Sequence, residues 1–177
     1  AALQNVKKLN LDAEMMESPP SEIAAKGWPQ TQAYLNQISH SSKTGVLHLD
    51  EMSLRRFPAP VCLMTELTEL SMHDNNIKVV PEAVGKLLNL TYLNLTSNQL
   101  STLPASVSKL MLLKDLLVAR NPMRTLPPGL GTLTSLKQLT VDADVLESPP
   151  RDILAKGSVD KILQYLQYLV AARTTLK

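Results

Sequence analysis

The chain has 177 residues, of which 44% are hydrophobic and 19% charged, and its formal net charge is +2. This composition predicts a folded, soluble domain and excludes a disordered chain, and no apolar run is long enough to span a membrane. The small net charge and an aromatic content of 3% argue against nucleic-acid binding, which needs a basic surface or aromatic stacking platforms.

Leucine dominates the hydrophobic residues, with 33 Leu against one Phe and one Trp. This bias indicates a repeat, and the same frame does recur at even intervals from Leu67, Leu90, Leu113 and Leu136. The unit that begins at Leu90 continues with Leu93, Leu95, Asn98, Leu100, Leu103, Pro104, Val107 and Leu110. Its alternating Leu residues predict a short strand, and the spacing after its proline predicts a tight turn or short 3-10 helix.

Six units follow this frame in chain order. A first unit begins at Val6, and five more begin at residues 44, 67, 90, 113 and 136. The interval between the first two starts is longer than one repeat and shorter than two. The excess contains a helix-like stretch over residues 29–38, so either a helix is looped out of a continuous array or a first array ends here and a second begins.

A cap sequence occurs twice. Residues 12–27 and 142–157 agree at 10 of 16 positions, and helix-like stretches follow at 29–38 and 159–170. A solenoid leaves an open apolar end, and a helix laid across that end is the expected stopper.

We therefore favour two arrays over a looped-out helix. Residues 1–43 are predicted to hold the last repeat and cap helix of a preceding array, residues 44–158 five repeats, and residues 159–177 a C-terminal cap helix and tail. Val6, Leu9 and Leu11 would leave an open apolar edge, through which the fragment could form a homodimer. We also expect further repeats before residue 1.

The repeat frame resembles the leucine-rich repeat family, whose pattern is LxxLxLxxNxLxxLPxxLxxLxx, over residues 6–158. The resemblance implies an α/β solenoid: a horseshoe with a concave parallel sheet, short 3-10 or helical turns on the convex side, and helical caps. In such a fold the column Asn75, Asn98 and Asn121 is expected to bond the backbone where each strand turns away.

The ending "SPP..I...G...I..YL" resembles cytoplasmic leucine-rich arrays of the Ras-suppressor, plant Ras-group-related, Roco and scribble kind. It implies an intracellular scaffold or signalling adaptor in the cytoplasm. The alternative is a regulatory segment of a larger signalling enzyme, a Roco-type GTPase, kinase or phosphatase. A receptor ectodomain is disfavoured because Cys62 is the only cysteine, so the chain has no disulfide caps.

The residues between the inward-pointing leucines are expected on the concave face. Twenty-four positions there hold seven acids and only two bases, Lys8 and Arg120, so this face carries about −5 and predicts a protein partner with a basic or mixed-charge surface. The predicted partner-binding residues are His48, Asp50, Glu51, Glu69, Ser71, His73, Asp74, Tyr92, Asn94, Thr96, Asp115, Leu117, Arg120, Gln138, Thr140 and Asp142.

Within this set, Tyr92, Leu117 and Arg120 are the predicted hot spot. Asp50 is expected next to His73, but an open sheet face offers neither a pocket nor a nucleophile for catalysis. The sequence also lacks phosphate-binding glycine loops, a nucleophile elbow, an HExxH helix and paired zinc cysteines. We expect no enzymatic activity, no cofactor and no metal site.

Overall fold

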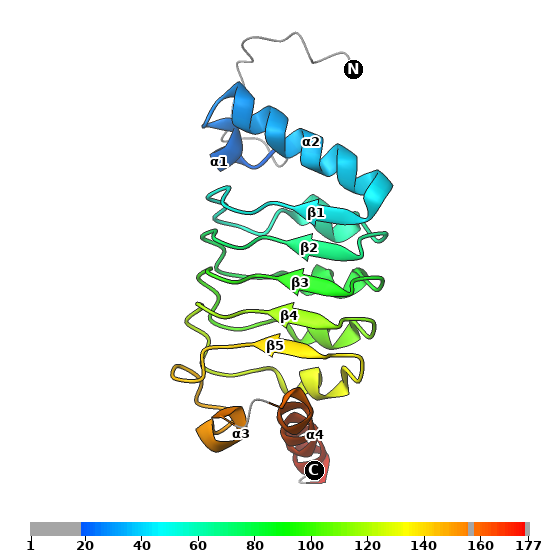
Figure 1. Cartoon of the computed structure of the whole chain (residues 1–177), viewed down its shortest axis with the longest axis vertical. Coiled ribbons are helices and arrows are strands. Elements are labelled where there is room, and N and C mark those ends of the chain that lie inside the picture. Colours follow the sequence, from blue (N-terminus) through cyan, green and yellow to red (C-terminus); the bar gives the residue numbers. More distant parts are fainter. Residues whose placement is uncertain (1–18, 156–157, 176–177) are drawn as a thin grey trace.

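The computed structural model describes residues 19–155 and 158–175. Their central element is a parallel sheet of five strands in sequence order. The strands are β1 (Val46–His48), β2 (Glu69–Ser71), β3 (Tyr92–Asn94), β4 (Asp115–Leu117) and β5 (Gln138–Thr140). Because each strand pairs with the next one in the chain, the polypeptide advances by one strand per turn of a solenoid (Figure 1).

The register between neighbouring strands equals the sequence repeat. Leu47 pairs with Leu70, Leu70 with Leu93, and Leu93 with Leu116, a shift of one repeat each time. Side chains alternate between the two faces of a strand, so one apolar residue per strand points inwards. All four of these leucines are 0% exposed. One strand lies within each of the five units that begin at residues 44, 67, 90, 113 and 136.

A layer of short 3-10 helices lies behind the sheet. These helices are η1 (Ala59–Leu63), η2 (Glu82–Lys86), η3 (Ala105–Lys109) and η4 (Pro128–Thr132). Each is preceded by a proline, which has a fixed φ and no N–H group that would be left unpaired there. Val61, Val84, Val107 and Leu130 from this layer are fully buried against the leucines of the strands. The expected convex turns are confirmed.

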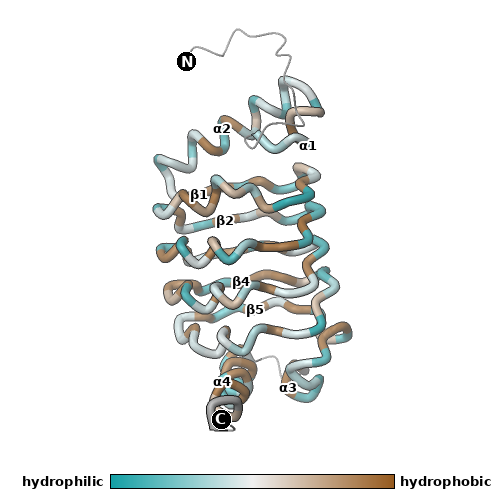
Figure 2. The backbone as a smooth tube through the Cα atoms, turned by 180° about the vertical axis from the view of Figure 1, so that it is seen from behind, coloured by the Kyte–Doolittle hydropathy of each residue, from teal (hydrophilic) through white to brown (hydrophobic). Residues whose placement is uncertain are grey.

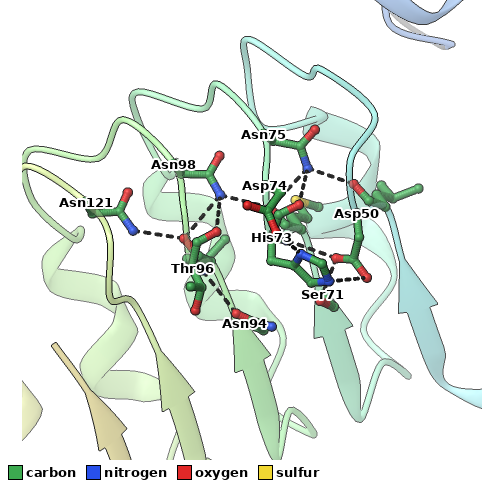
Figure 3. A network of polar contacts seen from close by, with 12 residues as sticks. Asp50, Ser71, His73, Asp74, Asn75, Asn94, Thr96, Asn98 and Asn121 are labelled. Atoms are coloured by element: carbon green, nitrogen blue, oxygen red, sulfur yellow. Dashed lines mark hydrogen bonds and ion pairs between the residues drawn. The ribbon is translucent and has the colours of Figure 1, made fainter.

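A ladder of asparagines joins the repeats where the strands end (Figure 3). The side-chain Nδ2 of Asn98 donates to the carbonyls of Met72 and Leu95, and its Oδ1 accepts from the N–H of Ile77. Asn75 and Asn121 bond the backbone in the same way one repeat earlier and one later. The structural role expected for this column is confirmed.

The residue before each of these ladder positions adopts a left-handed backbone. Asp74, Ser97 and Arg120 precede the three ladder asparagines and have φ between 54° and 56°. Glu51, the equivalent residue of the preceding repeat, lies before Met52 and has φ 58°. Glycine has no side chain to clash in this conformation, but here four residues with side chains adopt it. This left-handed row turns the chain away from the sheet once per repeat.

Helices lie at both ends of the array. At the N-terminal edge, α1 (Ser21–Ala24) leads to α2 (Trp28–Thr44), which contacts β1 and ends at Gly45 with φ 70°. At the other edge, α3 (Arg151–Ala155) leads to α4 (Val159–Thr175), which lies against η4. Both long helices extend beyond the stretches predicted at 29–38 and 159–170, because α2 continues through polar residues and α4 through alanine, arginine and threonine, which do not follow the apolar pattern.

The first helical pair acts as an N-terminal cap of the five repeats (Figure 2). Ile23 and Tyr34 are 1% and 0% exposed and belong to the same continuous core as the strand leucines. The repeat predicted from Val6, and the open edge predicted there, lie outside the described residues. The choice between a preceding array and a looped-out helix therefore stays a prediction.

Candidate protein-interaction surface

The candidate site is the outward side of the concave sheet. All sixteen predicted partner-binding residues lie on β1 to β5 or in the turns that directly follow these strands. Their positions follow from the alternation of side chains, because the leucine between each pair of outward residues points into the core. The structure places these residues on one face of the sheet, where all but Ser71 are exposed or half-buried. Their contact with a partner stays a prediction.

Asp50, Ser71 and His73 form a compact group at the ends of β1 and β2 (Figure 3). One carboxylate oxygen of Asp50 accepts from the Ser71 hydroxyl at 2.6 Å and from the His73 N–H at 2.9 Å. The other oxygen lies 3.4 Å from Nε2 of His73. The predicted proximity of Asp50 and His73 is confirmed, and the Asp50 carboxylate links two repeats.

His73 also contacts its sequence neighbour. Its Nδ1 lies 2.7 Å from a carboxylate oxygen of Asp74, so both ring nitrogens face carboxylates. Hydrogen bonds from His73 and Ser97 lower the pKa of the Asp74 carboxyl, and the charges of His73 and Arg120 act in the same direction. Asp74 therefore keeps its negative charge at neutral pH.

Three of the acids on this face are committed to the protein itself. Asp50 and Asp74 accept the bonds just described, and Asp142 accepts from the N–H of Asn121 at 3.2 Å. The other three acids make no side-chain hydrogen bond or ion pair with another described residue. We call them the uncommitted acids, and they are Glu51, Glu69 and Asp115.

The hydrogen bonds of the committed acids do not change the formal charge of the face. Its described residues carry six carboxylates and one guanidinium, that of Arg120, which gives a formal charge of −5. Lys8 and Asp12, which also entered the sequence estimate, lie outside the described residues. Of these six carboxylates, only those of the uncommitted acids are free of intramolecular bonds to other described residues.

The residues of the predicted hot spot lie on adjacent repeats. Tyr92 begins β3 and pairs with Asp115, whereas Leu117 ends β4 and pairs with Asn94. Both Tyr92 and Leu117 are half-buried, and Arg120 is exposed after β4. Tyr92 and Leu117 thus lie diagonally on neighbouring strands, with Asp115 directly beside Tyr92 and Asn94 directly beside Leu117, and their joint role as a hot spot stays a prediction.

The Ser71 side chain is buried, although its position in the sequence predicted that it would be exposed on the concave face. Its side chain is 3% exposed because it lies under Asp50, to which its hydroxyl donates. Repeat spacing alone places Ser71 beside the leucine of β2 and gives no sign of this contact. The residue supports Asp50 and is not available to a partner.

Other kinds of site are not found in the part of the chain that the structure describes. The His, Cys, Asp and Glu residues there form no group of three or more that could hold a metal ion. None of the helices among these residues has the length and hydrophobicity that a membrane crossing requires. Cys62 is buried in η1 as a free thiol, and burial raises its pKa.

Comparison with known proteins agrees with this geometry. Residues 65–123 match the family model described as leucine rich repeat. The fold is a leucine-rich repeat solenoid. No curated protein matches the sequence.

Several solved leucine-rich repeat structures are similar. The BIR3–SERK2 complex from Arabidopsis thaliana is 25% identical with a TM-score of 0.53, over 65% of this chain and 64% of that chain. The ectodomain of the receptor kinase SOBIR1 from Arabidopsis thaliana is 27% identical with a TM-score of 0.50, over 55% of each chain. The BIR2 ectodomain from the same plant is 23% identical with a TM-score of 0.50, over 54% of this chain and 52% of that one. This chain thus spans less than two thirds of each solved chain.

Proposed function

We propose that this leucine-rich repeat array is a non-catalytic interaction module that binds a protein partner on its concave sheet. The observation that carries the proposal is the open sheet face, where the uncommitted acids Glu69 and Asp115 flank the half-buried Tyr92 on the two neighbouring strands, and Leu117 lies further along β4. Tyrosine is a frequent anchor at protein interfaces, and charge at the rim steers the encounter and selects the partner. A basic or mixed-charge partner fits this surface.

The cellular role that we propose is that of an intracellular scaffold or signalling adaptor. Cys62 supports this role, because a buried free thiol without a disulfide partner is typical of proteins from reducing compartments. The similar BIR3–SERK2 structure is a complex of two proteins, which supports the use of this fold in protein binding.

The test reverses charge only at the uncommitted acids. A triple variant, Glu51→Lys, Glu69→Lys and Asp115→Lys, leaves the carboxylates of Asp50, Asp74 and Asp142 in their structural bonds. A matched control, Glu66→Lys, Asp144→Lys and Asp160→Lys, makes the same change of charge at exposed positions off the concave face. Circular dichroism should show that both variants are folded, because exposed substitutions rarely destabilise.

A partner captured with the wild-type chain is then titrated against each variant at two salt concentrations. We expect the concave variant to lose at least about tenfold in affinity and the control to stay near wild type. Added salt should weaken the wild-type complex, because at 0.1 M salt the Debye length is about 10 Å and charges further apart than this are largely screened. Equal affinities for the two variants would contradict binding on the concave face.

A further inference from the structure

The two ends of the array are built from two copies of one helical unit. Residues 17–27, ESPPSEIAAKG, correspond to residues 147–157, ESPPRDILAKG. The long helices that follow are equal in length and align through Tyr34-Leu35 and Tyr165-Leu166. Figure 1 shows the first copy beyond β1 and the second beyond β5, so the same unit is used at opposite edges.

The first copy docks the repeat that follows it. The Glu22 carboxylate accepts from the N–H of Arg55 at 2.8 Å, and Lys26 Nζ donates to the Met52 carbonyl and the Ser53 hydroxyl. Burial raises the pKa of Glu22, but these backbone N–H groups and the Ser21 hydroxyl outweigh it, so the pKa is lowered overall and the carboxylate stays charged.

The second copy docks the repeat that precedes it. Leu163 and Leu166 of α4 are 6% and 0% exposed, and α4 lies along η4. The Gln167 side chain also donates to the Gly131 carbonyl at 2.6 Å. One sequence unit can therefore cover either edge of a leucine-rich array.

Equivalent residues of the two copies differ in burial, and these differences define two faces of the helical unit. The positions that are more exposed in the second copy include Pro20 and Pro150, Glu22 and Asp152, Ile23 and Ile153, Tyr34 and Tyr165, and Gln37 and Tyr168. The positions that are more buried in the second copy are Ala24 and Leu154, Gln32 and Leu163, and Leu35 and Leu166. The first set covers a following repeat, and the second set covers a preceding one.

The second copy thus leaves one face open. We call Pro150, Asp152, Ile153, Tyr165 and Tyr168 the open cap face. Tyr168 is 68% exposed, and the Asp152 carboxylate, which is equivalent to Glu22, makes no hydrogen bond or ion pair with another described residue. An exposed tyrosine and an uncommitted carboxylate on the same helical unit are features that docking surfaces commonly have.

We propose that the open cap face docks the N-terminal edge of another leucine-rich repeat, as the first copy docks the repeat after Gly45. The contact between α1–α2 and β1 supplies the template for this occupant. In that template the carboxylate binds a backbone N–H in the turn after the first strand, and Asp152 offers the same group at the equivalent position.

A tandem chain tests this inference. Residues 1–175 are followed directly by a second copy of residues 45–177, so that α4 leads into the second Gly45 as α2 leads into the first. We expect amide hydrogen exchange in the second Val46–His48 to be as slow as in the first, because α4 then covers that edge. Fast exchange in the second Val46–His48, with slow exchange in the first, would overturn the proposal.

Matched variants distinguish docking of the second copy on the open cap face from its covalent attachment alone. Asp152→Lys with Tyr168→Glu alters the open cap face, whereas Asp160→Lys with Gln164→Glu makes the same charge changes on another exposed side of α4. We expect only the first pair to speed exchange in the second Val46–His48, by about tenfold or more. Equal effects of the two pairs would contradict the proposal.

A second tandem chain checks that the variants spare the fold. Here the second copy begins at residue 19 and carries its own α1–α2. Its strand should stay protected in both variant pairs, because α2 covers the edge. Loss of protection there as well would show that the variants act on folding and not on docking.

Discussion

Each ladder asparagine replaces backbone partners that an irregular turn cannot supply. Asn98 is 7% exposed and serves the N–H of Ile77 and the carbonyls of Met72 and Leu95, so one amide satisfies groups from two repeats. Buried polar groups without partners cost about 1–3 kcal/mol each. The ladder therefore sets how tightly consecutive turns are held together.

Replacement of Asn98 by alanine removes these bonds. We expect Asn98→Ala to lower the free energy of unfolding by about 3 kcal/mol, since it leaves buried groups unpaired. Asn76→Ala is the control, because Asn76 is exposed and should change stability by about 0.5 kcal/mol or less. Urea denaturation of both variants measures the difference, and similar losses would contradict the structural role of the ladder.

At the level of individual side chains, the sequence predicts some contacts and not others. The repeat spacing predicted the role of Asn98 and the proximity of Asp50 and His73, because both follow from the register of the strands. It could not predict that Ser71 donates to Asp50, or that Asp142 accepts from the Asn121 N–H. Those contacts depend on side-chain rotamers, which differ between repeats that share one backbone.

At the scale of elements, the contact between η4 and α4 depends on a close backbone approach. A Cβ atom on Gly131 would lie 2.7 Å from the Gln167 nitrogen and 2.9 Å from the Leu163 carbonyl oxygen. Both are backbone atoms of α4, so no side-chain rotation relieves the clash. Only glycine lets α4 lie this close to the last 3-10 helix.

We therefore expect Gly131→Ala to loosen the C-terminal cap. The free energy of unfolding should fall by about 1–3 kcal/mol, as is usual for overpacking, and amide exchange in α4 should accelerate. Gly129→Ala is the matched control in the same 3-10 helix, because its Cβ would meet Ser108, at 3.0 Å, and not α4. Unchanged exchange in α4 of Gly131→Ala would refute this account of the contact.

The elements differed in how well the sequence predicted them. Strands and 3-10 turns followed from leucine and proline positions, which the core imposes. The ends of the long helices did not, because α2 continues through polar residues and stops at Gly45, where a left-handed backbone ends the helix. The hydrogen bond from the Arg55 N–H to Glu22 joins the helical cap to the first described repeat. The repeat spacing does not predict it, because Glu22 lies outside the repeats.

At the scale of the whole molecule, each repeat contacts only its neighbours, so the central repeat couples the two halves. Leu93 is 0% exposed in the middle strand. We expect Leu93→Ala to lower the free energy of unfolding by about 2–5 kcal/mol. The N-terminal and C-terminal halves should then unfold at different urea concentrations.

Two probes would show this separation. Fluorescence of Trp28, the only tryptophan, reports on the N-terminal cap, and circular dichroism reports on the whole array. The control is Leu88→Ala, because Leu88 is 56% exposed and should leave the two transitions coincident. Coincident transitions and unchanged stability in Leu93→Ala would contradict coupling through the central repeat.

The left-handed row limits which residues can be introduced when this surface is engineered. Glu51, Asp74, Ser97 and Arg120 supply one side chain per repeat at the rim of the sheet. None is β-branched, and left-handed backbone costs L-residues about 1–2 kcal/mol each even without that crowding. A combinatorial library at these four codons should therefore omit Val, Ile and Thr. The adjacent codon for Thr96 bears no such restriction, so β-branched residues can be included there when new binding specificities are sampled.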